Sequence, residues 1–190
     1  MKKIKTNSGI SLIELIVALS LFIVVMLIST GALLSVVDAN RKARALESLM
    51  DNLGFAIENM SKSIRTGSTY HCSNSGNIAT PRDCSNGDEF FAFEASDGSD
   101  ATSNDQVVFR LNGNQIERST DGGSNYFSIT SPSITIDSVD GLQFYVVGAN
   151  PNDNKQPKVI MVIKGQAGTK AKEISRFEVQ TTISQRVVDN

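Results

Sequence analysis

Hydrophobic residues are concentrated near the N-terminus of this 190-residue chain. In the segment Ile10–Val37, 21 of 28 residues are hydrophobic, and no charged residue lies between Glu14 and Asp38. At 1.5 Å per residue, those 23 uncharged residues would form a helix of roughly 35 Å, enough to cross a hydrocarbon core of about 30 Å. The pattern therefore predicts a membrane-spanning helix over residues 10–37.

Two other interpretations of the apolar run stay open. A buried helix of a soluble protein would have to be wrapped on all sides, and only about 34% of the other 162 residues are hydrophobic. A cleaved secretory signal has a basic start and an apolar run of about 7–15 residues. Here the run is longer, and no clear small-x-small site follows it. The basic start is nevertheless present, in Lys2, Lys3 and Lys5.

After Val37 the pattern becomes one-sided, with a hydrophobic residue every three or four positions. Because Thr66-Gly67-Ser68 provides a stop, we expect one helix over Ile10–Arg65, whose part from residue 38 to 66 is an amphipathic stem. The stripe predicts packing on a sheet of the same chain, and a coiled-coil dimer or a contact between subunits remain alternatives. Its members are Ala39, Ala43, Leu46, Met50, Leu53, Ile57, Met60 and Ile64.

From Asp88 onward the hydrophobic period is two, or the runs are short and β-branched, as is typical of strands. Turn signals such as Asn112-Gly113 and Asp140-Gly141 separate the runs. We therefore expect a mostly antiparallel sheet over residues 88–190, after a cysteine loop at 67–87, and an α+β fold in which the long helix packs on the sheet. The expected strands are Glu89–Phe93, Gln106–Leu111, Gln115–Ser119, Tyr126–Thr130, Ser133–Asp137, Leu142–Val147, Val159–Lys164 and Ile174–Ile183.

The two cysteines, Cys72 and Cys84, lie in the polar loop. Outside the membrane such a pair most simply forms a disulfide, worth roughly 3 kcal/mol in the chain-entropy model. Free thiols are one alternative, and a metal site with His71 is another, although a closed zinc site would lack its fourth ligand. We expect His71 on the loop surface, and no motif pairs it with a nucleophile. We therefore predict no enzyme activity, no metal and no cofactor.

Acidic residues crowd the region around the first expected strand. We expect them to be solvated loop charges. Calcium is an alternative because it prefers oxygen ligands, although their spacing does not match an EF-hand loop. These residues are Asp88, Glu89, Glu94, Asp97, Asp100 and Asp105.

Glu14 stands at the entrance of the apolar run, five residues after Gly9. A lone carboxylate at membrane depth is costly and normally has a partner. A cut between Gly9 and Ile10 would create an α-amine close to Glu14, in the same subunit or in a neighbour. Pairing between subunits would also set their axial register.

The segment Ser8–Leu15, which reads Ser-Gly-Ile-Ser-Leu-Ile-Glu-Leu after a basic leader, resembles the class III signal of type IV pilins and pseudopilins. The resemblance implies that residues 1–9 are removed by a prepilin peptidase, which cuts after Gly9. It also implies N-methylation of Ile10 and a role of Glu14 in subunit register and assembly. Ile10 departs from the family pattern, in which Phe is the commonest first residue.

The C-terminal half is similar to J-type minor pseudopilins and related minor pilins in its last strands, Lys158–Ile163 and Phe177–Arg186. Gly31 stands where major pilins often have a Pro that bends the helix. The resemblance implies a pilin-like fold and a structural subunit of a type IV pilus or a type II secretion pseudopilus, at or near its tip. Its implied partners are the prepilin peptidase, other pilin or pseudopilin subunits, the inner-membrane assembly platform and membrane lipid.

Charge bears on location and on partners. The formal net charge is −2, and without the three leader lysines 15 basic side chains face 20 acidic ones, so we expect no direct binding of nucleic acid. The leader lysines favour a cytoplasmic N-terminus, but Arg41, Lys42 and Arg44 flank the other end. The expected disulfide favours an extracytoplasmic C-terminal domain, and the resemblance implies a single-pass protein of the bacterial cytoplasmic membrane. A membrane-anchored adhesin or binding protein that does not polymerise, and an anchored enzyme, remain alternatives.

Overall fold

The computed structural model consists of two units, Met1–Arg41 and Lys42–Asn190. A single helix, α1 (Leu12–Thr66, 55 residues), crosses the boundary between them, which confirms the long N-terminal helix expected over Ile10–Arg65. The leader lysines lie outside the described residues. The structure describes residues 9–99, 102–151, 153–168 and 174–186.

The first unit is formed by the apolar part of α1, and its side chains build no core. The large hydrophobic residues from Leu12 to Val37 are 38–75% exposed. The hydroxyls of Ser20 and Thr30 each donate a hydrogen bond of 2.8 Å to a carbonyl oxygen of the preceding turn, so these polar groups are satisfied within the helix. By length and composition α1 could cross a membrane, and none of its apolar window is buried. This argues against a core helix and is compatible with a single-pass anchor.

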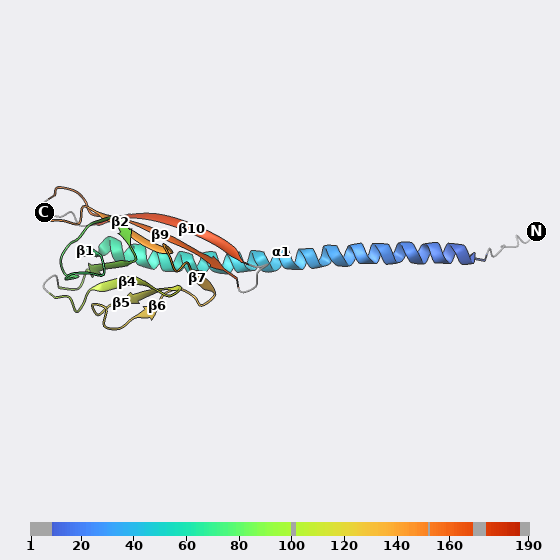
Figure 1. Ribbon diagram of the computed structural model, residues 1–190, viewed down its shortest axis with the longest axis horizontal. Helices are drawn as coiled ribbons and strands as arrows, with labels where there is room; N and C mark the ends of the chain where they lie inside the picture. The colour runs from blue at the N-terminus through green and yellow to red at the C-terminus, as the bar shows by residue number, and fades with distance from the viewer. Residues whose placement is uncertain (1–8, 100–101, 152, 169–173, 187–190) are drawn as a thin grey trace, which may run out of the picture. The chain divides into compact units, whose positions relative to one another are not determined.

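The second unit contains two antiparallel sheets, which lie on either side of the C-terminal part of α1 (Figure 1). The first sheet has the order β1-β3-β4-β5-β6, and the second has the order β10-β9-β8-β2, with β7 also paired to β9. The α+β class is therefore confirmed, although the sequence predicted one sheet and not two. The strands are β1 (Ser68–Cys72), β2 (Cys84–Asp88), β3 (Phe90–Glu94), β4 (Val107–Asn112), β5 (Gln115–Ser119), β6 (Phe127–Ser128), β7 (Ile134–Ile136), β8 (Leu142–Val147), β9 (Lys158–Ala167) and β10 (Ser175–Ser184).

The core of the second unit joins one face of α1 to both sheets. Leu53, Met60 and Ile64, all members of the predicted stripe, are buried together with Phe91 of the first sheet and Phe144 of the second. The stem therefore packs on the sheets of its own chain, as expected. The stripe prediction is wrong in part: Ala39, Ala43 and Met50 are exposed, and Leu49 and Ala56 are buried in addition.

The C-terminal end of α1 is held by the strands around it. The N–H of Gly67 donates to the carbonyl oxygens of Ser63 and Ile64 at 3.1 Å, and the Tyr70 hydroxyl donates to the Ile64 carbonyl at 2.6 Å. A Cβ atom at Gly67 would lie 2.3 Å from the Phe93 ring, so only glycine fits at this stop. The N–H of Arg186, just after β10, donates to the last-turn carbonyl of Arg65 at 2.9 Å.

Candidate functional site

The Gly9–Ile10 bond, the predicted cleavage site, lies before the first residue of α1 in non-helical chain. The Ile10 side chain is 73% exposed, and a Cβ built on Gly9 would meet nothing within 4 Å. The bond is therefore accessible in the described part of the chain, and no regular secondary structure would have to unfold before a peptidase could bind it.

Glu14 lies in the first turn of α1, where the N–H of Leu15 donates to the Ser11 carbonyl at 3.2 Å. Ser11 precedes the helix and Glu14 follows three residues later, which is the capping-box pattern that the sequence analysis overlooked. A carboxylate is also favourable near the positive end of the helix dipole. The position of Glu14 is therefore one at which a carboxylate favours the start of the helix, in addition to any role between subunits.

The surroundings of Glu14 are apolar. A shallow hollow of about 350 Å³ runs along this face of α1, lined by Glu14 together with Ile13, Val17, Ala18 and Leu21. Among the described residues, no cation lies within 4.0 Å of the Glu14 carboxylate. Within these residues the carboxylate therefore forms no ion pair with its own chain.

Cys72 and Cys84 form the predicted disulfide, with their Cα atoms 5.7 Å apart. Cys72 ends β1 and Cys84 begins β2, so the bond joins edge strands of the two sheets. Cys72 is 1% exposed. Because both sulfurs are consumed, the alternative metal site with His71 has no thiolate ligands. The loop expected over residues 67–87 is shorter than that range, since its two ends are β1 and β2.

His71 is not on the loop surface, as the sequence analysis expected, but is 1% exposed within β1. Its Nδ1 lies 2.7 Å from the Thr80 carbonyl oxygen, and its Nε2 lies 3.2 Å from the Ser75 carbonyl oxygen. The segment between the cysteines folds back over β1, where the Arg82 N–H donates to the Tyr70 carbonyl at 2.9 Å. Each ring nitrogen faces a carbonyl oxygen, and a neutral imidazole, with its single N–H, donates to one of the two.

The acidic residues around β3 have different environments, not one shared solvated loop. Glu94 is 1% exposed, and Gln106 Nε2 donates to its Oε2 at 3.5 Å, which corrects the expectation of a solvated charge at this position. Asp105 accepts hydrogen bonds from the Thr102 hydroxyl and the Ser99 N–H, and these lower the pKa of its carboxyl. Asp100 lies outside the described residues. Among the residues that are described, no three His, Cys, Asp or Glu side chains form a metal-binding group.

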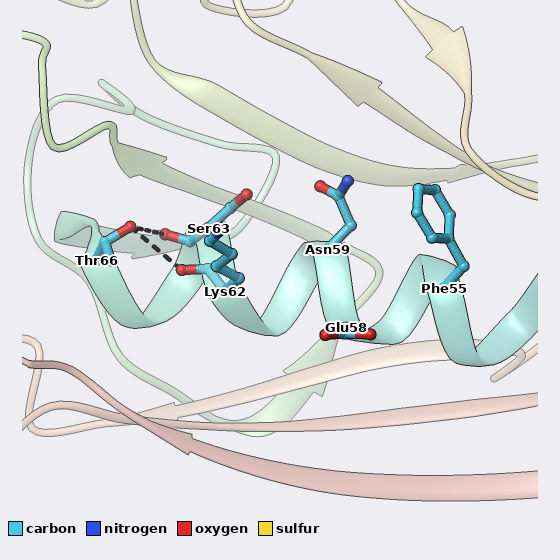
Figure 2. Close-up of a pocket in the computed structure, with 6 residues that line it drawn as sticks. All are labelled: Phe55, Glu58, Asn59, Lys62, Ser63 and Thr66. Atoms are coloured by element: carbon cyan, nitrogen blue, oxygen red, sulfur yellow. Dashed lines mark hydrogen bonds between the residues drawn. The ribbon is translucent and has the colours of Figure 1, made fainter.

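One face of α1 in the second unit stays uncovered by the sheets, and Figure 2 shows its side chains. A hollow of about 450 Å³ lies along it, and Phe55 is 69% exposed there. Figure 2 shows Glu58 directed away from Phe55 and Asn59. The lining contains one acid, Glu58, and one base, Lys62, with the hydroxyl groups of Ser63 and Thr66.

In the turn after β5, hydrogen bonds to the Asp121 carboxylate lower its pKa, which can be tested by titration. The Ser119 hydroxyl donates to Asp121 at 2.6 Å, and both the side-chain amide and the backbone N–H of Asn125 donate to the same carboxylate. These bonds lower the pKa of Asp121 from 3.8 to about 2. Their stabilisation is therefore complete above pH 3.8 and is lost as the pH falls through about 2. NMR titration of the Asp121 carboxyl carbon should give a midpoint near 2, and a midpoint near 3.8 would contradict these hydrogen bonds.

No protein-family model matches the chain, and no curated protein or solved structure matches it. A functional conclusion therefore depends on the chain's own features. These are an accessible bond before a long apolar helix, one carboxylate in its first turn, and a disulfide-linked domain.

Proposed function

We propose that this chain is a structural subunit of a pilus-type filament, a minor pilin or pseudopilin that assembles through α1. One observation carries the proposal. The accessible Gly9–Ile10 bond comes shortly before Glu14, the one carboxylate in the apolar part of α1, where the large hydrophobic side chains from Leu12 to Val37 are exposed. Such a helix needs a cover on all sides, which lipid supplies before assembly and neighbouring subunits supply afterwards.

Glu14 would determine how α1 aligns with the helices of neighbouring subunits. Replacing lipid by protein around apolar side chains releases little free energy. Helices in a membrane therefore associate through close packing and through hydrogen bonds or charges between polar groups. After cleavage at Gly9–Ile10, the new α-amine of one subunit is the natural partner for Glu14 of the next. A buried charge pair of this kind fixes register because any other register leaves a charge unpaired.

The finer assignment is supported by the resemblance of the Ser8–Leu15 segment to prepilin signals. On that basis we place the chain in the bacterial cytoplasmic membrane, with its disulfide-linked domain outside, as a substrate of prepilin peptidase that is N-methylated at Ile10 once cut. From there it joins a type IV pilus or a type II secretion pseudopilus. It contacts other subunits and the assembly platform.

Processing at Gly9 tests this proposal. In cells with active prepilin peptidase, mass spectrometry should find a mature chain that begins at Ile10. Gly9→Val should leave the leader attached because a side chain is placed at the cut. Gly31→Val is the matched control, since a Cβ there also meets nothing within 4 Å, and this variant should be cut normally. A chain that keeps residues 1–9 in such cells, or one cut beyond residue 37, would overturn the proposal.

A further inference from the structure

A polar hollow of about 320 Å³ lies beside the first sheet of the second unit. Four separate segments form it: the loop between the cysteines, the junction of β2 and β3, strand β4, and the segment before β6. The hollow therefore depends on the folded domain and not on one stretch of sequence. Its lining includes Asn74, Asp88, Glu89, Phe90, Asn112 and Tyr126.

The floor of this hollow is a row of side chains across three strands. Phe90 of β3 pairs with Arg110 of β4, and Arg110 pairs with Glu117 of β5, so the three side chains share one face of the sheet. Phe91, the next residue after Phe90, is 0% exposed in the core. Because side chains alternate along a strand, the row lies on the outer face of this sheet. Figure 1 shows β4, β5 and β6 next to one another on one side of α1.

Arg110 is fixed in place by its neighbours. Its Nη2 lies 2.8 Å from Glu117 Oε2, and its Nε donates to the same oxygen at 2.9 Å. The guanidinium carbon lies 3.4 Å from the centre of the Tyr126 ring, which is a cation–π contact. Asn112 Nδ2 donates to the other Glu117 oxygen at 2.9 Å. These contacts hold the floor in one arrangement before a ligand arrives, which lowers the entropy cost of binding.

Other polar groups of the lining are available to a ligand. In the described part of the chain, the Asn74 amide and the Glu89 carboxylate make neither a hydrogen bond nor an ion pair. Asp88 Oδ1 accepts the Phe90 N–H at 2.9 Å, which leaves its second oxygen. The hollow therefore presents carboxylate oxygens and amide groups above a floor that is already ordered.

The charges of the lining restrict the class of ligand. The carboxylates of Asp88 and Glu89 repel an anion, and the Arg110 guanidinium disfavours a cation beside it. The volume is near the lower end of the range for small-molecule sites, roughly 300–1,000 Å³. A small neutral ligand, or the end of a larger one, fits these conditions best.

We propose that this hollow binds one or two rings of a neutral sugar. Sugar hydroxyl groups both donate and accept hydrogen bonds, and they match the Asn74 amide and the carboxylates beside it. The apolar C–H face of a sugar ring packs on aromatic side chains, which Phe90 and Tyr126 supply here. This role is additional to the proposed function, since a filament subunit and an anchored binding protein could both display it.

NMR titration of the full chain tests the inference with four disaccharides: maltose, lactose, α-1,2-mannobiose and diacetylchitobiose. The micelles are made from a phosphocholine detergent, because alkyl maltosides carry a sugar themselves, and EDTA removes calcium. At least one disaccharide should shift the side-chain amide signals of Asn74 and Asn112 and the backbone amide signals of residues 88–90. These shifts should saturate in the millimolar range.

Two variants remove polar groups of the hollow without touching the floor. Glu89→Gln should weaken binding roughly tenfold, and Asn74→Ala between about threefold and tenfold, because each removes hydrogen bonds to hydroxyl groups. Neither side chain bonds to another described residue, so both variants should keep the wild-type spectrum elsewhere. Glu58→Gln and Asn59→Ala, at exposed positions of α1, are the matched controls and should bind like the wild type.

Four outcomes would overturn the inference. None of the four sugars shifts these signals, or both variants bind as tightly as the wild type. Tetramethylammonium or inorganic phosphate shifts the same signals at lower concentration than any sugar, which would assign the hollow to a charged ligand. Sugar binds only after calcium is added, which would make the acids metal ligands. None of these readouts needs leader cleavage or filaments, so a failure here leaves the proposed function standing.

Discussion

Replacing Cys72 and Cys84 together by alanine is expected to lower the free energy of unfolding by about 3 kcal/mol. The bond closes a short loop, with a sequence separation of 12 between the cysteines, and it joins the edge strands β1 and β2 of the two sheets. Without it, the unfolded chain gains loop entropy, and the link between the two edges is reduced to weaker contacts. Urea unfolding of the full chain in detergent, followed by circular dichroism, measures the difference.

The remaining contacts between the sheets indicate what the variant keeps. The Ile136 N–H donates to the Asn114 carbonyl at 2.9 Å, and the Asn114 side chain donates back to the Ile136 carbonyl at 2.8 Å. These bonds lie away from the disulfide, so we expect the variant to fold with both sheets in place. Ser85→Ala, at an exposed position next to Cys84, should change stability by no more than about 0.5 kcal/mol. If the double variant unfolded at the same urea concentration as the wild type, the bond would not stabilise the domain.

Patterns within one element predicted most of the secondary structure. The Asn112-Gly113 signal gives the hairpin of β4 and β5, in which Asn112 pairs with Gln115 and Gly113 takes a φ of +60°. Each of the eight expected strands has a counterpart among β3 to β10. These patterns are local because side-chain alternation and turn residues act within a few positions.

The two missed strands and the buried His71 depend on distant partners. β1 pairs with β3 and β2 pairs with β8, and neither strand has an apolar alternation of its own that would reveal it. The buried face of α1 also depends on distant partners, and it is rotated relative to the stripe predicted from the sequence. Leu49 is buried and Met50 is exposed because packing against the sheets, and not the helix period alone, decides which flank of the helix is covered.

In the candidate site, too, some features follow from local sequence and others depend on distant partners. Gly9, Ile10 and Glu14 are predicted from the sequence because the signal is their spacing along one segment, and their roles stay predictions. The Ser11-x-x-Glu14 spacing is a second local signal in this segment, because it matches a capping box at the start of a helix. Its consequence is practical: a substitution of Glu14 can act through the helix start as well as through a partner.

Glu14→Gln is therefore expected to be the most informative change in the chain. Glutamine retains the size and the capping capacity of glutamate and removes only its charge. If Glu14 pairs with the α-amine of a neighbouring subunit, its loss leaves that amine unpaired, which costs about 3 kcal/mol and corresponds to a loss of incorporation of more than 100-fold. Recovery of the chain in sheared filaments, normalised to its amount in the membrane, measures this.

Two further substitutions identify the cause. Glu14→Asp keeps the charge on a shorter side chain and should recover part of the incorporation. Ser20→Ala lies on the same exposed helix but removes a hydroxyl that bonds only within the helix, so incorporation should remain at the wild-type level. A chain with Glu14→Gln that is cut after Gly9 and enters filaments normally would show that charge pairing does not drive assembly. A wild-type chain that is absent from every filament would instead favour an anchored binding protein, for which the carboxylate is only a helix cap.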